Sequence, residues 1–126
     1  MSKNSWLQAI GLLGAIAVAA GAFGAHSLRD QVSADRLATW HTGARYLMWH
    51  VLGLLAVVLS QKDLHPWRWV LRCWLTGALI FSGSLFALVI LNKGWLGAIT
   101  PAGGILLICG WVIIFRSALL NRLDTE

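Results

Sequence analysis

The sequence predicts an all-α membrane protein, a compact bundle of four transmembrane helices in a single domain that covers residues 1–126. Its composition supports this fold, because 58% of the residues are hydrophobic and only 12% are charged, whereas soluble domains carry about 25% charged residues. Three stretches carry no charge over at least the roughly 20 residues that a helix needs to span about 30 Å of hydrocarbon. They also lack the polar face of a soluble helix, and they cover residues 5–25, 73–92 and 94–115.

The first span is expected at about residues 5–25. Small residues recur in it at every fourth position, at Gly11, Ala15 and Ala19. This spacing lets the backbone of another helix approach closely, so it predicts either packing within the chain or contact with a second copy. Gly21 and Gly24, near the end of the span, are expected at close helix contacts of the same kind.

The second span needs a polar lead-in. Only 16 residues separate Arg45 from Lys62, and at about 1.5 Å per residue they give about 24 Å of helix, too little to cross the hydrocarbon. We therefore expect the span to cover about residues 41–60, which places Arg45 at membrane depth. Ser33 is expected to cap a short amphipathic helix that leads into this span.

The third and fourth spans are expected at about residues 69–91 and 97–119. Ser82 and Ser84 can donate to carbonyls of their own helix or to a neighbouring helix. Together with Thr100 they are the candidates for hydrogen bonds between helices. Three glycines are expected where helix backbones touch, namely Gly83, Gly103 and Gly104.

The positive charges indicate an orientation and exclude one class of partner. With four spans, six lysines and arginines share the side of the termini and four share the opposite side. This bias predicts that both termini lie in the cytoplasm. The net charge of +5 is scattered over the segment ends and forms no basic face, so the chain is not expected to bind nucleic acid.

Polar side chains at the first loop and on the second span are the candidates for a ligand site. They are His26, Arg45, Tyr46, Trp49 and His50. A guanidinium has five donors, so Arg45 is expected to bind carbonyls near His26, a loop carboxylate or a lipid phosphate. The loop carboxylates are Asp30 and Asp35. Trp49, one turn away, could contact the guanidinium through its ring.

The two histidines of this set leave several hypotheses open. If His26 and His50 approach the same half of the bundle, they could bind a quinone or a lipid. They could also be the axial ligands of a haem in a redox subunit. The third interpretation is that they are hydrogen-bonded interior histidines that fix helix packing.

No catalytic motif is present in the sequence. There is no P-loop and no HExxH motif, and Asp30, Asp35 and Asp63 all lie in expected loops. The two cysteines, Cys73 and Cys109, have no metal-ligand or redox spacing. We therefore expect a non-enzymatic protein without metal or cofactor that binds membrane lipids, a membrane-protein partner or another copy of itself. The alternative is a protein that binds a small molecule, a quinone or a transported ligand through His26, Arg45 and His50.

Several short motifs follow one another in a specific order. They are GAFGAH at 21–26, Arg45-Tyr46 followed by His50, FSGSL at 81–85, TPAGG at 100–104 and Gly110-Trp111. As a set they resemble the YgdD-like family of small bacterial inner-membrane proteins, a domain of unknown function with relatives in animal cells. The resemblance implies a four-helix, multi-pass protein of the bacterial inner membrane, and it implies no reaction. Relatives often have alanine after the last motif histidine, where this chain has Val51.

Overall fold

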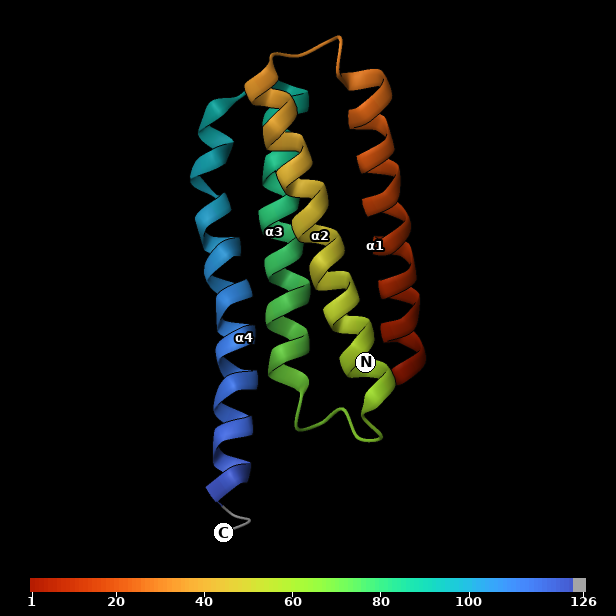
Figure 1. Cartoon of the computed structure of the whole chain (residues 1–126), viewed down its shortest axis with the longest axis vertical. Helices are drawn as coiled ribbons and strands as arrows, with labels where there is room; N and C mark the ends of the chain where they lie inside the picture. The colour runs from red at the N-terminus through yellow and green to blue at the C-terminus, as the bar shows by residue number, and fades with distance from the viewer. Residues whose placement is uncertain (124–126) are drawn as a thin grey trace.

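The computed structural model describes the backbone of residues 1–123 and the side chains of residues 1–120, and this part contains helices and no strand. Four long helices are joined by short connections (Figure 1). A π-helical turn, Gly24–Leu28, continues the first helix, and a 3₁₀ turn, Gly94–Ala98, precedes the last. The helices are α1 (Lys3–Phe23), α2 (Ala34–Ser60), α3 (Arg68–Leu91) and α4 (Thr100–Leu123).

Each of the four helices is long and apolar enough to cross a membrane, which confirms the predicted fold class. The candidate spans are Lys3–Leu28, Ala34–Ser60, Arg68–Leu91 and Gly94–Leu120. The polar lead-in belongs to α2 itself, which runs without a break from Ala34. Ser33 caps this helix, because its hydroxyl accepts the backbone N–H of Arg36 at 3.3 Å.

The helices pack in sequence order. The main contacts are α1 with α2, α2 with α3 and α3 with α4, so α1 and α4 lie at the outer sides of the bundle (Figure 1). Within the 18-residue apolar stretch of each candidate span, 39% is buried for α2 and for α3, against 22% for α1 and 17% for α4. The start of α1 and the end of α4 lie at the same end of the bundle (Figure 1). Much of both outer helices is therefore free to face lipid.

The core has two parts along the axis of the bundle. The larger cluster joins all four helices, and its most buried members include Leu54, Val58 and Trp74. The smaller cluster lies where α1 ends and α2 begins, around Trp40 and Leu88. Lipid tails are as apolar as these side chains, so close van der Waals packing and hydrogen bonds hold such helices together.

Glycines set the closest approach, and it lies between α3 and α4. A Cβ on Gly103 would lie 2.9 Å from the carbonyl oxygen of Gly77 and would overlap the backbone of Phe81. A Cβ on the adjacent Gly104 would make only ordinary contact with the Phe81 ring, at 3.7 Å. The predicted close helix contact at Gly103 is confirmed. The structure adds Gly77 to this contact, a residue that the sequence analysis did not predict there.

Two of the predicted packing glycines are not at contacts between helices of this chain. A Cβ on Gly21 or on Gly83 would meet no atom within 4 Å. The structure therefore shows no close contact within the chain at these two positions, and contact with a second copy stays a prediction. The reason is geometric, because a small residue permits close approach only on the face that a neighbouring helix covers, and the sequence does not say which face that is.

One hydrogen bond between predicted polar residues joins α3 to α4. The Ser84 hydroxyl lies 2.7 Å from the Thr100 hydroxyl and 2.9 Å from the carbonyl oxygen of Phe81. Since a carbonyl only accepts, Ser84 donates to Phe81 and Thr100 donates to Ser84. This confirms the prediction for Ser84 and Thr100. The prediction for Ser82 is wrong, because its hydroxyl is buried without a hydrogen-bond partner among the described residues.

Candidate functional site

His50 is buried and joins α2 to α4. Its Nε2 lies 3.2 Å from the indole nitrogen of Trp111, and its Nδ1 lies 2.8 Å from the carbonyl oxygen of Tyr46. An indole N–H only donates and a carbonyl only accepts. The Nε2 of His50 therefore accepts from Trp111, while its Nδ1 carries the proton and donates to Tyr46. This is a neutral histidine with both ring nitrogens occupied.

Aromatic rings surround His50 on two sides. The rings of Trp74 and Trp111 meet it edge-on, with centroids 5.9 and 6.2 Å away. Tyr46 stacks on Phe81 of α3 at 4.6 Å. Trp74 is only 1% exposed and lies so close to Gly53 and Gly110 that neither could carry a Cβ without a clash. His50 and Tyr46 thus belong to the interior packing of α2, α3 and α4.

His26, Arg45 and His50 do not form one cluster. His26 is exposed in the π-helical turn, whereas His50 is sixteen residues after Ala34 (50 − 34 = 16), or about 24 Å along α2 from that end. Arg45 and His50 are five residues apart, which turns them about 140° away from each other on a helix. The structure therefore does not bring these three residues together in one site. The two histidines are not placed as a pair of axial ligands, because His26 is exposed in the turn while both ring nitrogens of His50 contact groups inside the bundle.

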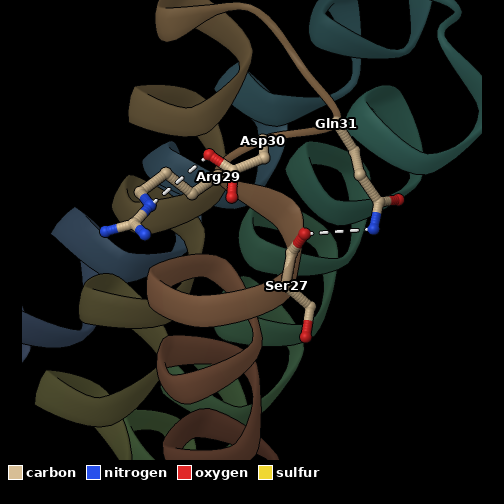
Figure 2. Close-up of polar contacts among 4 residues, drawn as sticks. All are labelled: Ser27, Arg29, Asp30 and Gln31. Carbon is tan, nitrogen blue, oxygen red and sulfur yellow. Dashed lines mark hydrogen bonds and ion pairs between the residues drawn. The ribbon is translucent and has the colours of Figure 1, made fainter.

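Arg45 does not bind the end of α1, contrary to the sequence-based expectation. Its side chain is exposed, and no hydrogen bond or ion pair links it to another residue in the part that the structure describes. Asp30 pairs instead with the adjacent Arg29 at 3.7 Å, and Gln31 donates to the carbonyl of Ser27 at 3.0 Å (Figure 2). Neither Asp30 nor Asp35 forms an ion pair with Arg45 in the described part of the chain.

Trp49 also differs from its expected role. It is 54% exposed, and its ring lies 5.0 Å from that of Tyr46. The cation–π contacts within residues 1–120 instead place Arg68 and Arg72 on Trp69. The Arg45 guanidinium therefore has no aromatic partner in this region either.

Arg45 lines a shallow groove between α1 and α2 that has a volume of about 460 Å³. It is eleven residues after Ala34 (45 − 34 = 11), about 16 Å along the helix and well inside the span. His41 lies one turn nearer to the first loop on the same wall of the groove. The other lining residues are apolar: Ala17, Val18, Gly21, Ala22, Ala44 and Met48. His41 was not among the predicted site residues, although its i, i+4 spacing to Arg45 places both on one face.

Trp40 fixes one end of this groove. Its indole N–H donates to the carbonyl oxygen of Ala20 at 2.7 Å, and its ring lies 4.5 Å from that of Phe86. A Cβ on Gly24 would be 2.6 Å from Trp40 and 3.0 Å from His41, so only glycine lets α2 approach here. The prediction of a close contact at Gly24 is confirmed, and Trp40 is the residue that fills it.

No metal centre is evident around this groove. Among the described residues, no group of three or more histidine, cysteine, aspartate or glutamate side chains lies where it could hold a metal ion. The chemistry that the groove offers is one guanidinium and one imidazole on an apolar wall within a candidate membrane span.

Comparison with known proteins identifies relatives over most of the chain. Residues 20–104 match the family model described as protein of unknown function DUF423. A UPF0382 membrane protein of Staphylococcus saprophyticus is 42% identical over 107 residues, which cover 83% of this chain and 89% of the relative. The UPF0382 membrane protein YwdK of Bacillus subtilis is 42% identical over 114 residues, with 85% and 93% covered.

The similarity extends beyond bacteria. A UPF0382 membrane protein of the yeast Schizosaccharomyces pombe is 37% identical over 110 residues, which cover 79% of this chain and 89% of the relative. No solved structure matches the chain. The matched region contains Gly24, Trp40, Arg45, His50 and Gly103. The chain therefore belongs to the DUF423 family of small membrane proteins of unknown function.

Proposed function

We propose that this protein is a non-enzymatic membrane protein that binds an anionic lipid in the groove between α1 and α2. The observation that carries the proposal is that Arg45, inside a membrane span, is exposed and has no partner among the described residues. In hydrocarbon its five donors need acceptors. A phosphate accepts two parallel hydrogen bonds from a guanidinium, so a lipid phosphate would satisfy much of this need.

The direction of the side chains favours a lipid that reaches in from the surface beside the first loop. Side chains of a helix tilt toward its N-terminus, so Arg45 and His41 point toward the end where Ala34 starts α2. The headgroup phosphate would then contact His41 and Arg45. The acyl chain would follow Gly21 and Ala17, whose small side chains leave the groove open.

We also propose that the protein lies in a bacterial inner membrane with both termini in the cytoplasm. The support is the excess of positive charge, six against four, on the side of the termini. The groove would then open toward the outer leaflet. Fusions of a phosphatase and of a fluorescent protein to the C-terminus test the orientation, since phosphatase activity would place Glu126 outside the cytoplasm.

Lipid binding is tested by native mass spectrometry of the protein purified in mild detergent and offered phosphatidylglycerol. Arg45→Gln should weaken retention of the lipid about tenfold, because a charge-assisted hydrogen bond contributes about 1.5–3 kcal/mol. Arg45→Lys should bind with intermediate strength, since an ammonium lacks the planar fork. Lys93→Gln, which removes a charge near the same membrane surface but outside the groove, is the control. Equal retention by all four proteins would refute the proposal.

A further inference from the structure

A second hollow, of about 410 Å³, lies at the opposite end of the bundle, where α1 starts and α2 joins α3. The start of α1 is tied to the end of α2 here, because the Lys3 ammonium donates to the carbonyl oxygen of Gln61 at 3.3 Å. Trp6 and Leu71 are both buried and give the hollow an apolar floor. We refer to this hollow as the basic pocket.

Four cations line the basic pocket against one carboxylate. The cations are Lys3, Lys62, Arg68 and Arg72. The carboxylate is that of Asp63, and its Oδ1 accepts the backbone N–H of His65 at 2.9 Å. In the described part of the chain, none of these cations forms an ion pair, since the ion pair found there joins Arg29 to Asp30 at the other end. Counted over lysine, arginine and acidic side chains, the pocket therefore carries an excess of three positive charges (4 − 1 = 3). The Arg68 guanidinium lies within hydrogen-bond distance of the His65 ring, which also lines the pocket and adds no negative charge.

The start of α3 adds to this positive potential. The positive end of a helix dipole favours acidic residues and disfavours cations. Arg68 is nevertheless the first residue of α3, and the first turn contains no acidic residue. Trp67 at the N-cap position offers no side-chain acceptor. Backbone N–H groups at such an end are suited to binding an anion.

The residues around the basic pocket indicate which kind of anion it would bind. Trp67 and Trp69 flank the pocket in the sequence, and tryptophans gather at the boundary between hydrocarbon and headgroups. The guanidinium carbons of Arg68 and Arg72 lie 5.9 and 5.4 Å from the Trp69 ring. Both cations thus contact an exposed tryptophan, a residue typical of headgroup depth, next to an apolar floor. Lipid headgroups are recognised by basic pockets between transmembrane helices on the cytoplasmic side.

We propose that the basic pocket binds the phosphate of an anionic phospholipid headgroup, with Arg68, Arg72 and Lys62 as its main contacts. This site is separate from the groove that contains Arg45, since the two share no lining residue. Each end of the protein would then hold an anionic lipid of its own leaflet.

The test measures retention of phosphatidylglycerol by native mass spectrometry, against phosphatidylcholine as the neutral lipid. The double variant Arg68→Gln/Arg72→Gln should bind phosphatidylglycerol about tenfold more weakly at this site and keep its weak binding of phosphatidylcholine. The control, Arg29→Gln/Lys93→Gln, removes the same number of charges from the opposite end and should bind as the wild type does. Lys62→Gln lies in a loop, where it breaks no helix, and should weaken binding in the same direction.

The outcomes separate the two proposed sites and the two sources of phosphate. Loss of lipid on Arg45→Gln but not on Arg68→Gln/Arg72→Gln would overturn this proposal and leave the groove proposal intact. The reverse result would support the basic pocket alone. Inorganic phosphate is added as a competitor, and if it binds the delipidated protein as tightly as phosphatidylglycerol does, the lipid assignment is wrong. Equal retention of phosphatidylglycerol by all variants would also overturn it.

Discussion

The interface between α3 and α4 and the interface between α1 and α2 are built differently. The first brings two backbones into contact at Gly77 and Gly103 and adds the hydrogen bond from Thr100 to Ser84. The second has a tight contact where Trp40 meets Gly24 and also buries apolar side chains such as Leu13 and Val51, but one side of it leaves the groove that contains Arg45. The comparison indicates that the first interface is closed by backbone contact, while the second leaves room for a ligand beside its packed part.

The largest expected effect comes from Gly103→Ala, which tests the closed interface. The new methyl group would overlap the Phe81 backbone, which cannot turn aside as a side chain can, and overpacking of this kind costs about 1–3 kcal/mol or more. Thermal unfolding in detergent measures the effect. Gly104→Ala is the matched control, because its methyl group would make only ordinary contact. Equal midpoints for the two variants would contradict the account of this interface.

A smaller loss is expected from Gly24→Ala at the closed end of the α1–α2 interface. Here the methyl group would meet the Trp40 ring at 2.6 Å, and the ring can shift only by weakening its hydrogen bond to Ala20. We expect a loss near the lower end of the 1–3 kcal/mol range for overpacking, that is about 1 kcal/mol. Gly21→Ala on the same helix, where the methyl group meets nothing, should leave the midpoint unchanged. A loss of stability for Gly21→Ala as large as for Gly24→Ala would show that the groove is in fact closed.

The smallest of these effects concerns the link between α2 and α4. A double-mutant cycle of His50→Phe and Trp111→Phe should give a coupling of about 0.6 kcal/mol, the average for hydrogen bonds between membrane helices. His50→Phe alone should cost more, because it leaves the Trp111 N–H without an acceptor. No coupling between the two positions would mean that the hydrogen bond seen at 3.2 Å does not contribute.

The sequence predicted the helices well and the site poorly, for physical reasons. Span length and the absence of charge depend on local composition, so the four helices followed directly from them. Whether a residue faces a neighbour depends on the helix rotation that packing selects. For this reason the close helix contacts within the chain include Gly24 and Gly103 but not Gly21 and Gly83.

The same limit affected the polar residues. The sequence placed Arg45 at membrane depth but paired it with His50, which lies about 140° away around the helix and faces α4. His41 was overlooked, although it lies one turn from Arg45 on the same wall of the groove. The helical period alone places His41 on the same face as Arg45 and His50 on another face. That α1 lies beside the face with Arg45 could be known only from the structure.

The most direct test of the central claim fills the groove without disturbing the bundle. Gly21→Leu places a large side chain on the groove wall, where a Cβ meets no atom within 4 Å. The account predicts that Gly21→Leu unfolds at the wild-type midpoint but loses the phosphatidylglycerol that depends on Arg45, as measured by native mass spectrometry. Wild-type retention of that lipid by a folded Gly21→Leu variant would contradict the claim that the groove between α1 and α2 is a lipid site.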